Sequence, residues 1–358
     1  MFCIAAFIIL IVLSIFSAKY RKMLGKSWAC VARRVTFRPC DTNFKEEVKS
    51  KLLSKVALKK PNMVKAADIG LEVGAVLILL ITAWSLYVVV KSGLNLYVYG
   101  TCNPSNSASC SLGAEACSIE TVKPSFVDSV TSFKVHVWLG NEFKDLGKTV
   151  GNIPTRLQNW EAKDYVPQNA TYQKTFDQNK QTALEVIDPG CTFCKQLYIN
   201  QKQAGFADRY NLTYIAYPIP SAKEKSGYKF ENSLLIAKYL EAMKIRPLKD
   251  AATPSDWQII DRIFTWQDDE KVSYQIRFNA FYNSKDAEAK LLQWAKELGY
   301  SDDDIAALKT SAMSSTVSDI IAANRKTVED KIKTVKIPTS IFDGKRHDGV
   351  LSVQDLQR

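Results

Sequence analysis

The sequence predicts two membrane-spanning helices, a polar region, and a C-terminal α/β domain that contains a long helical insertion. Two apolar runs near the N-terminus bracket a strongly basic segment. A strand–helix–strand pattern surrounds Cys191 and Cys194, and helical periodicity then continues until the chain returns to extended structure near Pro338. The expected boundaries are 1–18 and 69–99 for the two spans, 19–68 for the basic loop, 100–173 for the polar linker region and 174–358 for the α/β domain.

The two apolar runs have the length and composition of membrane helices. The first covers residues 2–18 without a charge, and the second covers about residues 73–90. A membrane helix needs roughly 20 mostly apolar residues, so the second run is long enough and the first is just long enough. The first run fits a signal peptide badly, because no basic segment precedes it and no small-residue cleavage site follows it.

The net charge of +11 is confined to the segment between the two runs. Fourteen Lys and Arg residues and three acidic residues lie between Lys19 and Lys65, so the rest of the chain is neutral. Because basic loops stay on the cytoplasmic side, we expect the N-terminus outside, the loop inside and everything after about Gly100 outside the cytoplasm. The clustering also favours anionic lipid headgroups over nucleic acid, since no aromatic interleaving or groove-reading motif accompanies it.

The α/β domain is expected to begin with one βαβ unit. The apolar run 183–188, bounded by a Pro-Gly pair, predicts a buried strand. A helix is expected from Cys191 to about Gly205, followed by a second strand over 212–217. The preceding polar region contains one expected helix, around 126–146.

Helices and a final hairpin complete the expected domain. Residues 337–342 predict a strand, and Asp343-Gly344 predicts a hairpin turn into 345–347. Ser352 is a suitable cap for a short final helix. Between the βαβ unit and this hairpin, apolar residues recur three and four apart over 230–243, 256–266, 287–298 and 316–332, and Ser301 can cap a further helix.

Cys191 and Cys194 form a Cys-x-x-Cys pair, a pattern used for zinc binding and for thiol–disulfide exchange. No second pair is present, and His136 and His347 lack zinc-finger spacing, so no metal site is expected. The pair opens a helix, where unpaired amides favour an anion and lower a thiol pKa. Cys191 is therefore expected to be the exposed attacking thiolate, and Cys194, one turn later, the resolving thiol.

The segment ALEVIDPGCTFCK resembles the active-site segment of the thioredoxin superfamily, in particular of its DsbA-like branch. The resemblance covers about residues 174–357, and implies a thioredoxin-like fold with a helical insertion at about 228–333. It also implies that Glu185, six positions before Cys191, relays protons to Cys194. A carboxylate buried there would have the raised pKa that such a role needs, whereas the alternative is a partly exposed strand residue.

The segment VKIPTSIFDGK resembles the cis-proline loop of the same superfamily. This implies a cis peptide bond before Pro338, which turns the backbone so that Ile337 can offer its N–H and C=O to a substrate strand. The alternative is an ordinary trans bond at the start of an edge strand. Thr192 and Phe193, between the two cysteines, are expected to complete the substrate-binding surface.

The resemblance implies a thiol–disulfide oxidoreductase, and the two apolar runs with the basic loop predict that it is membrane-anchored and extracytoplasmic. Its expected substrates are cysteine pairs of exported proteins. No cofactor or metal is implied, but a membrane redox partner is, such as a quinone-linked oxidase of the DsbB or vitamin K epoxide reductase type. Phe193 stands where oxidants of the superfamily often carry His, so oxidase, reductase and isomerase all stay open. A non-catalytic thioredoxin-fold binding module or chaperone is the alternative from a different class.

Cys102, Cys110 and Cys117 are expected outside the cytoplasm, where disulfides persist. Because their number is odd, one is left over as a free or intermolecular thiol, or as a partner that exchanges with the first active-site cysteine; the sequence does not reveal the pairing. Cys30 and Cys40 fall in the expected cytoplasmic loop and are too few for a metal site.

Overall fold

The computed structural model describes residues 61–104, 115–119, 124–248 and 251–358, with short pieces before residue 61. The chain forms two compact units, residues 1–90 and 91–358. Most of the first expected span and of the basic loop, including Cys30 and Cys40, lies outside the described residues, and so does Cys110.

A long helix, α4 (Val64–Tyr99), occupies the second apolar run, after a short 3₁₀ turn, η1 (Pro61–Met63). The helix expected over 69–99 is therefore present and begins five residues earlier. Among the described residues, α4 is the one helix that is long and apolar enough to cross a membrane by length and composition. At 1.5 Å per residue its 36 residues exceed the roughly 30 Å of a bilayer's hydrocarbon core.

Two helices, α5 (Phe126–Thr131) and α6 (Val135–Gly151), replace the single stretch expected over 126–146. The chain breaks between them because Phe133 adopts a left-handed conformation with a φ of 54°. The end of α6 contacts the last turns of α4, where the Thr149 hydroxyl donates to the Asn95 side chain at 2.7 Å. A short helix, α7 (Ile153–Leu157), and a 3₁₀ turn, η2 (Ala162–Tyr165), then lead into the α/β domain.

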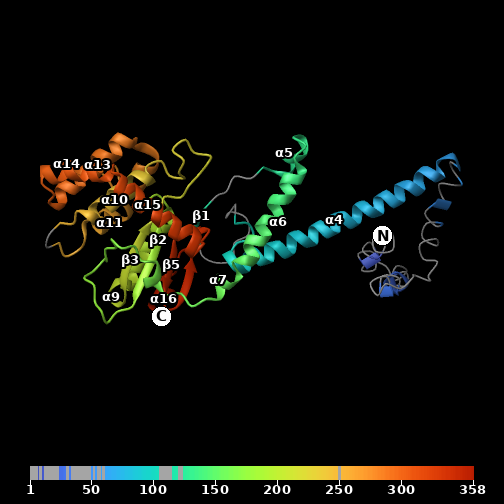
Figure 1. Cartoon of the computed structure of the whole chain (residues 1–358), viewed down its shortest axis with the longest axis horizontal. Helices are drawn as coiled ribbons and strands as arrows, with labels where there is room; N and C mark the ends of the chain where they lie inside the picture. Colours follow the sequence, from blue (N-terminus) through green and yellow to red (C-terminus); the bar gives the residue numbers. More distant parts are fainter. Residues whose placement is uncertain are drawn as a thin grey trace. The chain divides into compact units, whose positions relative to one another are not determined.

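The α/β domain is built on a four-stranded sheet with the order β3-β2-β5-β6 (Figure 1). Strands β2 (Thr182–Ile187) and β3 (Asn211–Ala216) are parallel, whereas β5 (Thr339–Phe342) runs antiparallel to β2. Strand β6 (Lys345–Asp348) returns beside β5 through the expected turn, in which both Asp343 and Gly344 have positive φ. Helices α8 (Thr192–Ala204) and α9 (Phe206–Arg209) connect β2 to β3, as the βαβ prediction requires.

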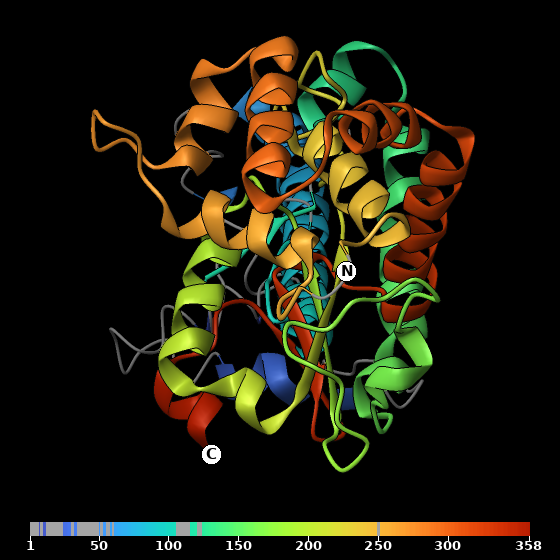
Figure 2. The ribbon, with the colours of Figure 1, turned by 90° about the vertical axis from the view of Figure 1, so that its left-hand side faces the viewer.

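Between β3 and the hairpin, the chain forms a helical insertion. Figure 2 shows its helices gathered at one end of the strands, with the final helix α16 (Val353–Gln357) toward the other end. The insertion comprises α10 (Ser233–Ile245), α11 (Ser255–Thr265), α12 (Tyr274–Ile276), a π-helical turn η3 (Arg277–Phe281), α13 (Ser284–Leu298), α14 (Asp302–Ala312), α15 (Ser315–Lys326) and a second π-helical turn η4 (Thr327–Ile332). All the helices expected from periodicity are present, and Ser301 caps α14 as predicted.

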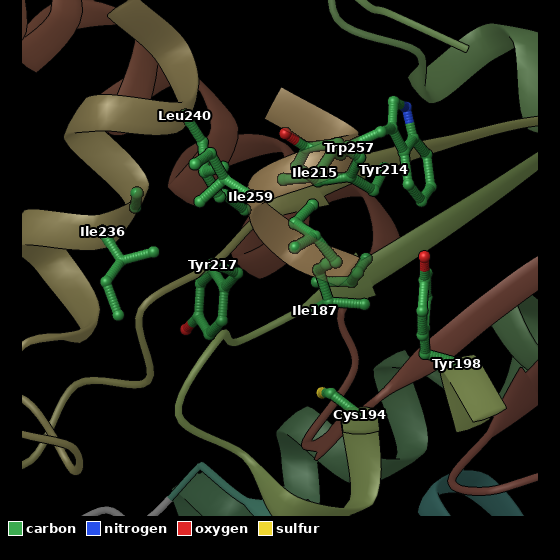
Figure 3. Close-up of a cluster of buried hydrophobic side chains, with 14 of the residues drawn as sticks. Ile187, Cys194, Tyr198, Tyr214, Ile215, Tyr217, Ile236, Leu240, Trp257 and Ile259 are labelled. Carbon is green, nitrogen blue, oxygen red and sulfur yellow. The ribbon is translucent and has the colours of Figure 1, made fainter. Parts of the chain in front are cut away.

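One hydrophobic core joins the sheet to the insertion. Figure 3 shows side chains of β2 and β3 meeting those of α10 and α11, with Cys194 at the border of the cluster. The labelled core residues are Ile187, Tyr198, Tyr214, Ile215, Tyr217, Ile236, Leu240, Trp257 and Ile259. A βαβ unit, a helical insertion and a β-hairpin followed by a helix make a thioredoxin-like fold of the DsbA type, which confirms the predicted fold class of this domain.

A second, two-stranded sheet was not expected. Strand β1 (Cys117–Ser118) pairs antiparallel with β4 (Lys336–Ile337), so that Cys117 lies opposite Ile337. The single strand predicted over 337–342 is therefore wrong, because Pro338 divides it between two sheets.

Candidate active site

The Cys-x-x-Cys pair lies at the junction of β2 and α8. Cys191 is the residue that immediately precedes the helix, and its carbonyl accepts a hydrogen bond from the N–H of Cys194 at 3.0 Å. The free amides of a helix N-terminus stabilise a thiolate at Cys191. The local position of both cysteines is therefore as predicted.

The state of Cys191 differs from the expectation of an exposed thiolate. Its side chain is fully buried, and its sulfur forms a disulfide with Cys117. Cys194 is a free, buried thiol. The expectation of exposure was wrong because residues 115–119 lie against the site. Of the three upstream cysteines, Cys102 is also disulfide-bonded.

The Ile337–Pro338 peptide bond is cis, as the resemblance implied. The Ile337 carbonyl oxygen lies 3.6 Å from the Cys191 sulfur, so the loop and the cysteine face each other. Ile337 also pairs with a strand, as expected of a substrate platform, but this strand belongs to the same chain and contains Cys117.

Glu185 lies on β2, opposite Ser340 of β5, and is 3% exposed, which rules out the partly exposed alternative. Its carboxylate accepts hydrogen bonds from the Gln201 side-chain amide and, at 3.4 Å, from the Ser340 hydroxyl. Burial raises the pKa of Glu185 to about 7, although both hydrogen bonds act to lower it. A carboxyl group with this pKa can accept and return a proton near neutral pH.

Asp188 is a second buried carboxylate at the site, and sequence reasoning missed it. Its N–H donates to the Cys194 sulfur at 3.4 Å. Its carboxylate accepts from the Gly190 and Ile219 N–H groups, at 2.8 and 2.7 Å, and from the Ser233 hydroxyl. Burial raises its pKa to about 6. The signal was an acidic residue directly after a buried strand, three positions before the first cysteine.

Burial also raises the pKa of the Cys194 thiol well above its usual value. The Asp188 N–H opposes this shift, whereas the nearby charges of Asp188 and Glu185 add to it. Cys194 is therefore held as a protonated thiol, and it needs a proton acceptor before it can attack a disulfide.

The helical insertion holds the loop before Cys191 in place. The Gln275 amide donates to the carbonyls of Pro189 and Cys191 at 2.9 and 3.1 Å. Asn279 donates to the Gly190 carbonyl at 2.8 Å. These contacts come from residues about 85 positions downstream in a segment to which the sequence assigned no role in the site.

The two residues between the cysteines differ in exposure. Thr192 is exposed, whereas Phe193 is partly buried and packs against the core. Within the part of the chain that the structure describes, no group of three or more His, Cys, Asp and Glu side chains is arranged to hold a metal ion.

No protein-family model and no curated protein matches this chain. Several solved structures are similar to it. They include the thiol-disulfide exchange protein alpha-DsbA2 from Wolbachia pipientis (18% identity, 55% of this chain and 88% of that chain, TM-score 0.39). Another is MdbA, a thiol-disulfide oxidoreductase from Corynebacterium diphtheriae (15% identity, 53% and 87%, TM-score 0.37). A third is the reduced form of DsbG from Mycobacterium tuberculosis (10% identity, 52% and 84%, TM-score 0.36).

Proposed function

We propose that this protein is a thiol–disulfide oxidoreductase whose site binds an extended, cysteine-containing segment of a client protein. One observation carries the proposal: Cys191, at the start of α8, is disulfide-bonded to a cysteine on a strand that pairs with Ile337. Backbone pairing beside a disulfide is the arrangement that a mixed disulfide with a client requires.

The proposed reaction uses three groups of the site. In the oxidising direction, a client thiolate attacks Cys191 of a Cys191–Cys194 disulfide, and Cys194 leaves as a thiolate that takes up a proton. A second client thiolate then attacks the client sulfur of the mixed disulfide and releases Cys191. The reducing direction is the reverse, and there Cys194 must lose its proton before it attacks Cys191. Glu185, with a pKa of about 7, is suited to accept that proton.

The direction of exchange defines the alternatives within this class. Phe193 cannot donate a hydrogen bond to the Cys191 thiolate, so the site lacks one group with which oxidants stabilise their reduced form. A reductase or isomerase uses the same residues. A reduction potential near −120 mV for the Cys191–Cys194 couple would indicate an oxidant, and one near −270 mV a reductant.

We further propose that the domain is anchored in a membrane, outside the cytoplasm, and acts on exported proteins. The apolar helix α4 and the charge confined to the preceding segment support this placement. The division into two spans, a basic loop, a linker region and a catalytic domain belongs to the same proposal. A quinone-linked membrane protein of the DsbB or vitamin K epoxide reductase type would then restore the oxidised site.

The test compares Cys191→Ser and Cys194→Ser in the full chain, purified in detergent, with a reduced two-cysteine peptide and with the same peptide oxidised. We expect Cys191→Ser to abolish exchange with both. Cys194→Ser, combined with Cys117→Ser so that Cys117 cannot displace the peptide from Cys191, should instead accumulate a mixed disulfide with the oxidised peptide, detectable by mass spectrometry. Exchange that persisted in Cys191→Ser would contradict the assignment of Cys191 as nucleophile. If Cys191→Ser retained the protein's role in the cell, a non-catalytic binding module or chaperone would be the better interpretation.

The proposed location of the domain outside the cytoplasm has a separate test. A membrane-impermeant maleimide applied to intact cells, after mild reduction, should label Cys191. Labelling that requires permeabilised cells would place the domain in the cytoplasm and would favour the reductase.

A further inference from the structure

Residues 115–119 occupy the position that a client segment would need. Cys117 lies opposite Ile337, and Ser118 lies opposite Lys336. Cys191 is fully buried in this state. No thiol or disulfide of an external protein can reach its sulfur while the segment is in place.

Several elements hold this segment besides the disulfide. The Ile119 N–H donates to the Val335 carbonyl at 3.1 Å, and the Glu115 carbonyl accepts from the Val350 N–H at 3.0 Å. Lys229 donates to the Ser118 carbonyl at 3.4 Å. Backbone bonds therefore flank Cys117 on both sides, and the Ile119 side chain packs against the core. The segment thus forms an antiparallel backbone pair with the residues before Pro338, and backbone pairing of this kind is a mode by which extended peptides bind.

We propose that Cys117 is a third redox cysteine of this chain, and that residues 115–119 are an internal substrate strand. This strand covers the peptide-binding surface formed by Lys336, Ile337 and Cys191, which is called the groove below. This inference rests on the proposed function. It assigns a role to the one upstream cysteine whose partner lies in the active site, and it defines the groove as a site for a peptide with cysteine opposite Ile337 and an apolar residue two positions later.

The closed form opens by an exchange within the chain. The Cys194 thiolate attacks the Cys191 sulfur, the Cys117–Cys191 bond breaks, and a Cys191–Cys194 bond forms. The electron pair leaves on the Cys117 sulfur, which takes up one proton for the one that Cys194 lost. One disulfide replaces another, so the step consumes no oxidant or reductant.

The two forms have the same oxidation level but differ in access to the site. In the open form, Cys191 is paired with Cys194 and the groove can accept a client. In the closed form, the groove is filled by a segment tethered to the domain, and such tethered ligands act at effective concentrations on the order of millimolar. The apparent Kd for an external peptide therefore equals the Kd of the open form divided by the fraction of molecules that are open, so a small open fraction weakens binding.

Disulfide mapping of the oxidised full chain in detergent, after an acid quench and alkylation, tests the bonding. We expect Cys117 joined to Cys191, with Cys194 alkylated, in a substantial share of molecules. If Cys117 were alkylated in every oxidised molecule while Cys191 and Cys194 were paired, the inference would be overturned and the proposed function would stand.

Kinetics with a peptide substrate test whether residues 115–119 compete with an external peptide for the site. Cys117→Ser should lower the KM for a reduced two-cysteine peptide by about tenfold or more, because the covalent competitor is gone. Ile119→Pro keeps Cys117 but removes the N–H donated to Val335, so it should lower KM by a smaller factor. Cys40→Ser makes the same chemical change in the basic segment of the sequence, 77 positions before Cys117, and serves as the control.

The possible outcomes distinguish a failure of the internal-strand proposal from a failure of the proposed function. An unchanged KM in Cys117→Ser, with exchange still dependent on Cys191, would refute the internal strand only. Absence of exchange in both the wild-type chain and Cys117→Ser would refute the proposed function, and the inference with it.

Discussion

The backbone N–H of Asp188 donates a hydrogen bond to the sulfur of Cys194 at 3.4 Å, while the carboxylate of the same residue is buried beside that thiol. The main chain of Asp188 thus favours a thiolate at Cys194, and its charge opposes one. The Cys194 thiol therefore has a second titratable acid beside it, in addition to Glu185.

Asp188→Asn should lower the pKa of Cys194, because a nearby negative charge is removed. The rate of Cys194 alkylation in the reduced protein, measured against pH, checks this. The same change should reduce the free energy of unfolding by about 1–3 kcal/mol, since the amide cannot accept all the hydrogen bonds that the carboxylate accepts from Gly190, Ile219 and Ser233. Asp319→Asn, at an exposed position of α15, is the control; an equal effect there would contradict the assignment.

Glu185→Gln should flatten the pH dependence of stability. The pKa of Glu185 rises from 4.5 to about 7 on folding, so the folded chain binds more protons than the unfolded chain between these values. Stability contributed by the protonated form is therefore present below pH 4.5 and is lost as the pH rises to 7, by about 3 kcal/mol. Denaturation at a series of pH values should show this slope in the wild type and a smaller one in Glu185→Gln. Asp188 titrates in an overlapping range and leaves a residual slope.

Gln275→Leu should loosen the loop before Cys191. The substitution retains bulk but removes the donor to the carbonyls of Pro189 and Cys191. Leaving these buried acceptors unpaired costs about 1–3 kcal/mol of stability. Amide hydrogen exchange across residues 188–194 should accelerate. Gln293→Leu, at an exposed position of α13, should leave both unfolding and exchange near the wild-type values.

Gly190→Ala should destabilise the domain by about 1–3 kcal/mol, because the added methyl group would overlap with the Cβ and ring of Phe230. Shortening Phe230 to Ala cannot relieve this fully, since its Cβ is itself in the way. Gly147→Ala is the matched control. It lies inside α6 with open space around it, so the same change should be neutral or stabilising there. Chemical denaturation of the two variants decides the sign.

Local patterns were sufficient for most of the α/β domain. The strand before Cys191, the helix after it and the helices of the insertion follow from hydrophobic periodicity and capping, which act over a few residues. The prediction failed at two positions where hydrophobic periodicity does not reveal a change of backbone direction. Phe133 breaks one helix by its left-handed backbone, and Pro338 divides one extended segment between two sheets.

The sequence by itself determined which residues make up the candidate site: a Cys-x-x-Cys pair at a helix start, Glu185 on the preceding strand and a proline loop beside them. Only the tertiary structure decided what Cys191 is bonded to. Its partner Cys117 is 74 positions away, on a strand of two residues that has no periodicity, and disulfide connectivity cannot be read from sequence. The contact with Gln275 and the burial of Asp188 also depend on how distant segments pack, which no local pattern encodes.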